Sequence, residues 1–377
     1  MGTPTIAYVS TFPPTQCGIA TYTSDLISHF HKLYPQLTPL KVRMKFDSDS
    51  FEYEESNEIS VVFSNISDYE MALKQINRTS VLAVNLQHEF KIFGAKDGEN
   101  ILHLIEGLDK PLLTTFHTVN PELPENRKSI FLSIANRSDL IYIFSKRAKD
   151  ILCNTYSISS HKVKIIPHGV PNITFCLPHY SKFRKKLDTK IVFVSAGHLR
   201  ESKGIEIALF ALHKLKIRFT NFKYLIIGAN HPKNQTAEQY REHLNKLIIE
   251  LELENHVVFV NQYLPIEDLI EYIQASDIAL VPYTRKEQSS SGILSLFMAC
   301  GRPIVSTNFQ YAVSEVEKDN GILAEINNEN NFYSAIEHLT ENVPIREHMM
   351  RANYLKTKKW TWDTVAAKYY EGIKELS

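Results

Sequence analysis

The sequence has no excess of charge of either sign. It contains 42 lysine and arginine residues and 42 aspartate and glutamate residues, so its formal net charge is zero. Binding to nucleic acid or to an anionic membrane surface depends on concentrated positive charge. The balance therefore gives no reason to expect a nucleic-acid partner, and it limits any association with a membrane to a peripheral one.

Cysteine is scarce, and long apolar runs are missing. The cysteines form no CxxC pair, which excludes the common zinc-binding motifs and is typical of reduced thiols. Residues 1–14 show no basic stretch followed by an apolar one, and no later run approaches the length of a membrane span. These absences predict a soluble, cytoplasmic protein. The four cysteines are Cys17, Cys153, Cys176 and Cys300.

Two common nucleotide-binding motifs are also absent. A dinucleotide-binding domain needs GxGxxG directly after its first strand, but TFPPTQCGIATY (11–22) supplies only Gly18. No GxxxxGK[ST] sequence occurs. Dehydrogenase and P-loop kinase functions are therefore disfavoured. We also identify no convincingly placed carboxylate site of the DxD type, so we expect no metal ion and no cofactor.

What the sequence does contain is a repeated alternation of short β-branched runs and longer helical patterns. This alternation is typical of βαβ units around a parallel sheet, and 377 residues exceed the usual size of one hydrophobic core. We therefore predict two α/β domains, residues 1–170 and 171–358, joined near residues 168–185. The predicted strands are 5–10, 41–46, 59–65, 80–87, 111–117 and 140–145 in the first domain, and 190–197, 223–229, 256–262, 278–283 and 302–307 in the second.

Ligands of such domains bind at the carboxyl ends of the strands, and in the second domain this rule directs attention to EQSSSGILSLFMACGRPIVST (287–307). Ser289–Ser291 and Gly292 come directly before an apolar helical stretch, where unpaired N–H groups create a site for an anion. Lys203 follows another strand of the same domain and could neutralise that anion. Ordinary alternatives remain, because the serines could be a simple N-cap and the lysine a solvated surface residue.

In the first domain, polar residues likewise follow the predicted strands. His88 and Glu89 follow one strand and His117 another, so they could bind a sugar hydroxyl, orient an incoming hydroxyl or titrate in catalysis. Each could also be a satisfied core residue. Gly18 would keep the first loop tight and leave room for a substrate. Gln16 in the same loop joins His88 and Glu89 as a candidate for the acceptor side.

The ordered set of these motifs resembles one family over nearly the full length of the chain. The sequence is similar to the retaining glycosyltransferases of family 4, the "glycosyl transferases group 1". The motifs that carry the resemblance are FPPTQCGIATYTSDL (12–26), QHEFKIFG (87–94), TTFHTV (114–119), IIPHGVP (165–171), AGHLRESKGIE (196–206), IIGANHP (226–232), VVFVNQYLPIEDLIEYIQASDIALVPY (257–283), SSGILSLFMACGRPIVST (290–307) and KKWTWDTVAAKYYEGI (358–373).

The resemblance implies the GT-B fold, an α/β architecture of two facing Rossmann-like domains with parallel sheets and a cleft between them. It implies a nucleotide-sugar donor held mainly by the second domain and an acceptor held mainly by the first. A C-terminal helix, residues 359–377 near Trp360 and Trp362, is expected to cross back onto the first domain.

The resemblance also implies roles for individual residues. Lys203 matches the lysine that binds the diphosphate, and Ser291 with Gly292 matches the small residues that receive its distal phosphate. His117 matches the histidine that faces the donor sugar, and Gly18 matches the glycine of the first loop. We therefore place His117, Lys203 and Glu89 in catalysis. The candidates for donor binding are Gly18, His198, Arg200, Lys203, Gln288, Ser290, Ser291 and Gly292.

Three positions depart from the family pattern. His198 stands where the family commonly has arginine, and Arg200 is nearby but out of register. Gln288 and Leu296 stand where the family has two glutamates eight residues apart, one for the sugar hydroxyls and one for the ribose. Gln288 can still hydrogen-bond a sugar, whereas Leu296 cannot hold a ribose diol. Glu287 is adjacent, but we expect its side chain to point elsewhere.

These observations favour a metal-independent, retaining transfer of a mannose- or glucose-type hexose from a GDP- or UDP-linked donor to a hydroxyl acceptor such as a glycan, with a slight preference for GDP-mannose. Closure about residues 168–185 would exclude water. Two alternatives remain open. One is a catalytically lapsed GT-B protein that binds a sugar or a partner, which Leu296 and His198 favour. The other is a GT-B disaccharide phosphorylase.

Overall fold

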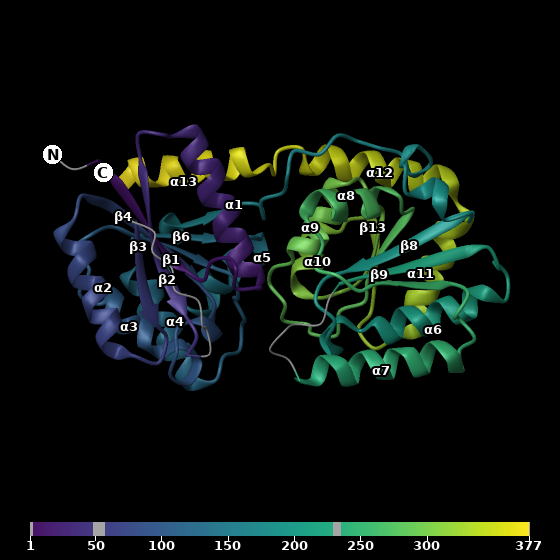
Figure 1. Ribbon diagram of the computed structural model, residues 1–377, viewed down its shortest axis with the longest axis horizontal. Helices are drawn as coiled ribbons and strands as arrows, with labels where there is room; N and C mark the ends of the chain where they lie inside the picture. Colours follow the sequence, from purple (N-terminus) through teal and green to yellow (C-terminus); the bar gives the residue numbers. More distant parts are fainter. Residues whose placement is uncertain (1–2, 48–56, 229–234, 377) are drawn as a thin grey trace. The chain divides into compact units, whose positions relative to one another are not determined.

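The chain folds into two compact units. The computed structural model describes residues 3–47, 57–228 and 235–376. The first unit comprises Met1–Gly169 and Trp362–Ser377, and the second comprises Val170–Thr361 (Figure 1). The predicted boundary after residue 170 differs from this division by one residue, and the predicted start of the C-terminal segment at residue 359 differs by three.

The first unit contains a parallel sheet of seven strands in the order β3-β2-β1-β4-β5-β6-β7. The order reverses between β1 and β4, and the carboxyl ends beside such a reversal form the usual ligand site of a doubly wound sheet. The strands are β1 (Thr5–Ser10), β2 (Thr38–Lys45), β3 (Glu58–Val62), β4 (Val81–His88), β5 (Leu112–Phe116), β6 (Leu140–Ile143) and β7 (Val163–Ile165). The α-helices are α1 (Gly18–Leu33), α2 (Ile66–Arg78), α3 (Leu102–Ile105), α4 (Glu125–Arg137), α5 (Lys146–Asp150) and α13 (Trp362–Leu376).

The second unit repeats this plan with six parallel strands in the order β10-β9-β8-β11-β12-β13, so its reversal lies between β8 and β11. The strands are β8 (Ile191–Ala196), β9 (Phe222–Ile227), β10 (Val257–Val260), β11 (Ile278–Val281), β12 (Ile304–Thr307) and β13 (Gly321–Ala324). The α-helices are α6 (Ile205–Lys216), α7 (Gln235–Glu250), α8 (Ile266–Gln274), α9 (Gly292–Ala299), α10 (Gln310–Glu315), α11 (Glu329–Glu341) and α12 (Val343–Thr357).

The prediction of two Rossmann-like units with parallel sheets is confirmed, and each predicted strand is present. Two further strands, β7 and β13, were missed. Both are short edge strands that pair on one side only, and β13 begins with a glycine, so neither has the apolar run that identifies a central strand. Ala229, the last residue of a predicted strand, and residues 229–232 of the motif IIGANHP lie outside the described residues.

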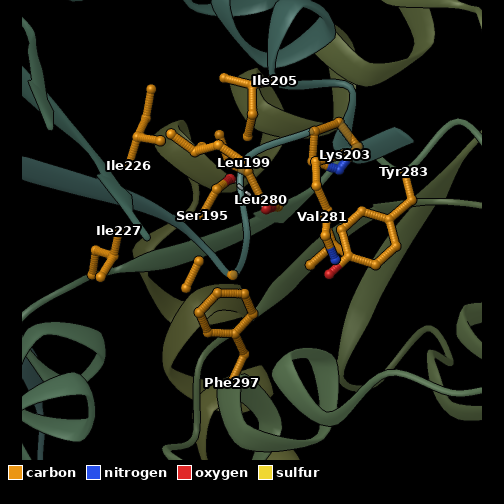
Figure 2. Close-up of a pocket in the computed structure, with 13 residues that line it drawn as sticks. Ser195, Leu199, Lys203, Ile205, Ile226, Ile227, Leu280, Val281, Tyr283 and Phe297 are labelled. Atoms are coloured by element: carbon orange, nitrogen blue, oxygen red, sulfur yellow. Dashed lines mark hydrogen bonds between the residues drawn. The ribbon is translucent and has the colours of Figure 1, made fainter. Parts of the chain in front are cut away.

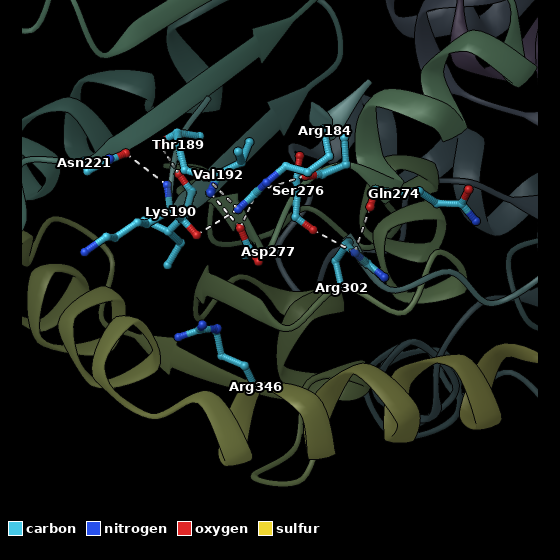
Figure 3. A network of polar contacts seen from close by, with 12 residues as sticks. Arg184, Thr189, Lys190, Val192, Asn221, Gln274, Ser276, Asp277, Arg302 and Arg346 are labelled. Atoms are coloured by element: carbon cyan, nitrogen blue, oxygen red, sulfur yellow. Dashed lines mark hydrogen bonds and ion pairs between the residues drawn. The ribbon is translucent and has the colours of Figure 1, made fainter. Parts of the chain in front are cut away.

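A buried arginine holds the second unit together away from its strand ends. Arg302 has no exposed surface, and its guanidinium donates to the carbonyl oxygens of Cys300 (3.0 Å), Gln274 (3.2 Å), Ser276 (2.7 Å) and Cys176 (2.7 Å). Figure 3 shows Arg302 beside a neighbouring ion pair, in which Arg184 donates to the Asp277 carboxylate at 2.6 Å. The planar guanidinium thus ties together three backbone segments, near residues 176, 274–276 and 300.

The helix α13 belongs to the first unit although it is the last element of the chain. Trp362 at its start is 4 % exposed and lies edge-on to the ring of Tyr22 in α1, with 4.9 Å between ring centroids. Gly169 packs against the same indole, because a Cβ added at Gly169 would lie 2.2 Å from Trp362 Cε3. The close approach of the backbone to the indole therefore requires glycine at residue 169.

Among the described residues, no helix combines the length and apolar character that crossing a bilayer demands.

We expect Gly169→Ala to destabilise the first unit by about 1–3 kcal/mol, because overpacking against a rigid ring displaces the indole or the backbone. Urea unfolding followed by circular dichroism measures the effect. Gly18→Ala is the matched control, because a Cβ at Gly18 meets no described atom within 4 Å. An equal effect of the two substitutions would contradict the packing argument.

Candidate functional site

The candidate donor site lies in the second unit, where β8 and β11 end at the reversal of strand order. The loop after β8 carries His198, Arg200 and Lys203, and the loop after β11 leads through Gln288 and the serines into α9. The two loops are joined directly, since Thr284 N donates to Ser202 O at 3.2 Å. Figure 2 shows the pocket between these strand ends, which holds about 300 Å³ of empty space, part of it open to solvent.

Lys203 is held in this pocket by a tight turn. Lys203 is the last residue of the 3₁₀ turn Glu201–Lys203. Gly204 follows it with a left-handed φ of +59°. A Cβ at Gly204 would lie 2.1 Å from Pro282 O, so only glycine allows the turn to pack against the loop after β11. Lys203 is half-buried in this turn, so the alternative of an ordinary solvated surface lysine is not supported.

The Lys203 ammonium lies 3.8 Å from the centroid of the Tyr283 ring. Figure 2 shows the two side chains next to each other. Burial lowers the pKa of Lys203 below that of an ordinary lysine, although Tyr283 raises it in part, while the nearby Arg200 lowers it further. An ammonium with little water around it interacts more strongly with an incoming anion than a solvated one. The site is thus prepared for a negatively charged ligand.

The amino end of α9 is next to this lysine. A Cβ built on Gly197, which directly follows β8 and has a φ of +115°, would lie 3.8 Å from Lys203 Nζ and 3.6 Å from Ile293 Cγ1. The strand end, the ammonium and the first turn of α9 therefore surround one small space. Gly197 keeps that space open.

The serine-rich turn caps α9. Ser291 is the N-cap residue, and its hydroxyl accepts a hydrogen bond from Leu294 N at 3.2 Å. The simple N-cap interpretation of Ser291 is therefore confirmed, and the hydroxyl retains a proton to donate. Gly292 is the first helical residue, and Gln288 Nε2 donates to Ser290 O at 3.0 Å across the turn. The N–H groups of the first turn of α9 are positioned for an anion beside Lys203.

The residues that depart from the family pattern occupy different surroundings. Leu296 is buried in α9 at 5 % exposure and contributes to packing. The half-buried ring of His198 is stacked on Tyr263, with 6.0 Å between centroids. Arg200 is exposed and precedes the 3₁₀ turn of Lys203. Of these three residues, Arg200 alone therefore adds a fixed charge close to the pocket.

His117 in the first unit comes directly after β5 and is only 5 % exposed. Its Nε2 lies 2.8 Å from Gln87 Oε1, and its ring is edge-on to Tyr22 at 4.9 Å. Burial holds the pKa of His117 well below its usual range, and the neighbouring His168 and His88 lower it further. His117 is therefore a neutral imidazole at physiological pH.

Glu89 caps the 3₁₀ turn that follows β4. Its Oε1 accepts from Phe90 N at 3.0 Å and its Oε2 accepts from the Thr118 hydroxyl at 2.6 Å. Burial raises the pKa of Glu89, while these hydrogen bonds partly lower it. Through Thr118 the carboxylate is attached to the loop that carries His117, so the two catalytic candidates of this unit lie on connected loops.

The prediction of an acceptor-side role for His88 is not supported. His88 has no exposed surface, neither ring nitrogen has a hydrogen-bond partner among the described residues, and the ring packs among Phe90, Phe93 and Phe116. Burial lowers the pKa of His88 to about 3. It is a core residue, because the alternation of β4 places His88 on the same face as the buried Val84 and Leu86.

The first loop leaves Gln16 and Gly18 exposed. Gly18 begins α1 and is not among the described glycines with positive φ, so the turn does not depend on it, contrary to the prediction. Its contribution is space, since no described atom lies within 4 Å of an added Cβ. The Cys17 side chain, which sequence reasoning did not consider, caps α1 by accepting from Ala20 N at 3.3 Å.

Two other residues of these sites were missed, Tyr283 beneath Lys203 and Gln87 beside His117. Tyr283 ends the motif that includes β11, and Gln87 begins the motif QHEFKIFG, so both stood at strand ends where ligand-site residues gather.

One DxD spacing was also overlooked, at Asp47-Ser-Asp49. Asp47 follows β2 and accepts from Ser64 at 2.5 Å, while Asp49 lies outside the described residues. The described residues contain no group of three or more side chains suited to holding a metal ion.

Comparison with known proteins finds a family match for part of the chain. Residues 179–356, which lie within the second unit, match the model of the family "Glycosyl transferases group 1". A similar curated relative is the D-inositol 3-phosphate glycosyltransferase of Corynebacterium diphtheriae, 23 % identical over 68 % of this chain and 64 % of that protein. The chain thus spans less than two thirds of that relative's length.

Similar solved structures confirm the GT-B fold over the whole chain. The sucrose-phosphate synthase of Thermosynechococcus elongatus superposes with a TM-score of 0.80 at 16 % identity, covering 99 % of this chain and 98 % of that one. Anabaena HepE in complex with UDP-glucose superposes with a TM-score of 0.74 at 16 % identity, covering 99 % of this chain and all of that one. At these identities the likeness establishes the fold of this chain and leaves its substrates to other arguments.

Proposed function

We propose that this protein is a retaining glycosyltransferase that moves a hexose from a nucleoside-diphosphate sugar to a hydroxyl acceptor without a metal ion. The observation that carries the proposal is the meeting of the Lys203 ammonium, the open space at Gly197 and the amino end of α9 at the reversal of the second sheet. This arrangement suits the diphosphate of such a donor, because a buried cation and unpaired N–H groups converge on one point.

The chemistry that the site would support is stabilisation of a leaving diphosphate. Negative charge grows on the distal phosphate as the glycosidic bond breaks. Lys203 and the N–H groups of α9 would therefore interact more strongly with the transition state than with the bound donor. In the retaining route we propose, the departing phosphate takes the proton of the acceptor hydroxyl on the same face of the sugar.

The donor that we favour is a GDP- or UDP-linked mannose or glucose. Support comes from the names of the relatives, which include a phosphatidyl-myo-inositol mannosyltransferase of Propionibacterium freudenreichii, and from the UDP-glucose complex of HepE. The acceptor would bind on the first unit, where Gln16 is exposed and Glu89 is attached to the loop of His117.

The test is binding of nucleoside diphosphates and their sugar conjugates by the full chain, measured as thermal stabilisation with and without EDTA. A ligand at 100 times its dissociation constant stabilises a protein by about 2.7 kcal/mol, which is easily detected. We expect one nucleotide base to stabilise selectively, with no change on adding EDTA, and the matching sugar nucleotide to be consumed when acceptors are supplied.

The same experiment distinguishes the transferase from the second candidate function. Leu296, buried where a ribose-binding carboxylate is expected, favours a lapsed GT-B binding protein. If no nucleotide stabilises the chain, the transferase proposal is wrong. Release of a sugar phosphate that depends on inorganic phosphate would instead identify a disaccharide phosphorylase.

A further inference from the structure

We infer that Gln87 is a positioning residue, which fixes the tautomer and the orientation of His117 for the reaction. The inference rests on the proposed function for the reaction that His117 would serve, but the contacts that carry it lie wholly within the first unit. Gln87 is the last residue but one of β4, it has no exposed surface, and it faces away from the side of β4 that carries His88.

The Gln87 amide is held by hydrogen bonds to its neighbours. Its Nε2 donates to Asn85 Oδ1 at 2.6 Å and to Thr115 Oγ1 at 3.2 Å, and its Oε1 lies 2.8 Å from His117 Nε2. Asn85 Nδ2 is buried and has no hydrogen-bond partner among the described residues, and reversing both amides would give it one by turning Gln87 Oε1 toward Asn85. In both arrangements the Gln87 amide holds the same nitrogen of His117.

The direction of the Gln87 amide decides the protonation of the neutral His117 ring. With Oε1 toward the ring the proton is on Nε2, and with the amide reversed it is on Nδ1. The ring is also held edge-on to Tyr22 at 4.9 Å and against Phe144 at 5.2 Å. His117 is thereby set in one tautomer and one orientation.

The support extends to the end of the chain. Thr115, which receives one N–H of Gln87, shares a 2.5 Å hydrogen bond with the hydroxyl of Tyr369 in α13, and that hydroxyl lies 3.3 Å from the Tyr22 hydroxyl. All four side chains are nearly or fully buried. The C-terminal helix thus supplies the last link of a network that ends at His117, which gives α13 a role in the site beyond covering the sheet.

The experiment is ¹⁵N nuclear magnetic resonance of the full-length protein with labelled histidine, in which the His117 signals are assigned by their loss in His117→Phe. We expect the wild-type signals to be those of a neutral ring in a single tautomer, unchanged between about pH 6 and pH 8. In Gln87→Met, which keeps the length of the side chain but removes the hydrogen bond, we expect a mixture of tautomers or a change to the other one. Signals of a mixture of tautomers, or of an imidazolium at pH 7, in the wild-type protein would overturn the inference without any variant.

Kinetics give the second readout, with Leu86→Val as the matched control. Leu86 is the fully buried neighbour of Gln87 on the opposite face of β4, so its truncation disturbs the same strand without touching His117. We expect Gln87→Met to lower kcat roughly 10- to 100-fold with little change in KM for the donor, since misplacement of a catalytic group by about 1 Å has effects of this size. Leu86→Val should leave the tautomer unchanged and kcat nearly so.

The outcomes separate this inference from the proposed function. If transfer occurs and Gln87→Met behaves like Leu86→Val in both readouts, the positioning role is wrong and the transferase stands. If no donor is bound or consumed, the proposed function is wrong, and the resonance spectra still decide whether Gln87 sets the tautomer of His117.

Discussion

Replacing Lys203 by alanine is expected to lower the rate of transfer roughly 100- to 1,000-fold, the usual effect of removing one preorganised group from a site where negative charge develops. The ammonium has no described substitute at the same position, since Arg200 is exposed. Donor affinity should fall less than kcat, because the diphosphate gains charge as the sugar departs. Steady-state kinetics with the nucleotide sugar that stabilises the wild-type protein provide the measurement.

The control for this substitution is Lys185→Ala, which removes an exposed lysine of the same unit. We expect it to leave kcat and KM unchanged.

A second expected property of Lys203 is its effect on the pH dependence of nucleotide affinity. Because burial lowers the pKa of Lys203, its charge is lost at a lower pH than that of a surface lysine, so affinity should fall earlier as pH rises. The Lys203→Ala protein should lack this dependence, and its persistence there would contradict the assignment.

Arg302→Met is expected to have the largest effect on stability. The substitution keeps much of the side-chain volume but leaves four carbonyl oxygens without their donor, two of them on the buried residues Cys300 and Ser276 and two on the half-buried residues Gln274 and Cys176. Each unsatisfied buried group costs about 1–3 kcal/mol, so relaxation and entry of water leave a net loss of roughly 3–5 kcal/mol. For a unit of this size, the loss corresponds to a decrease in melting temperature of about 10 °C.

Thermal unfolding followed by circular dichroism tests this expectation, with Arg218→Met as the control. Arg218 makes surface ion pairs with Glu337 and Glu341 in the same unit, and its side chain is 58 % exposed. Exposed pairs of this kind contribute little, so the control should unfold close to the wild-type temperature. Similar melting temperatures for the two variants would show that the Arg302 contacts are not what stabilises this part of the unit.

Several features of the site follow from local sequence. Parallel strands buried on both faces need continuous apolar runs, which is why the central strands were visible, whereas the short edge strands β7 and β13 lacked that signal. Ser291 at the start of an apolar helix was a candidate N-cap on its side-chain chemistry alone, and it is one. The glycine at 204 likewise marked the turn after Lys203.

His88 and His117 of the first unit have different environments, although the motifs around them are similar. His88 and His117 both follow an apolar strand, and both were read as candidates for chemistry. The alternation of β4 distinguishes them, because it directs His88 into the aromatic core and Gln87 to the opposite face beside His117. The sequence carries this alternation in the order of Val84, Leu86 and His88, which share one face of β4.

The sequence by itself determined the parallel α/β units and the positions of their strand ends, because periodicity and apolar runs depend on neighbours along the chain. It also placed Lys203 and the turn before α9 at such ends. Only the tertiary structure showed that the Lys203 ammonium lies against the Tyr283 ring, and that Tyr369 from the last helix supports the Gln87 amide beside His117. Such contacts join residues distant in sequence, and their geometry depends on strand register and helix packing, which no local pattern encodes.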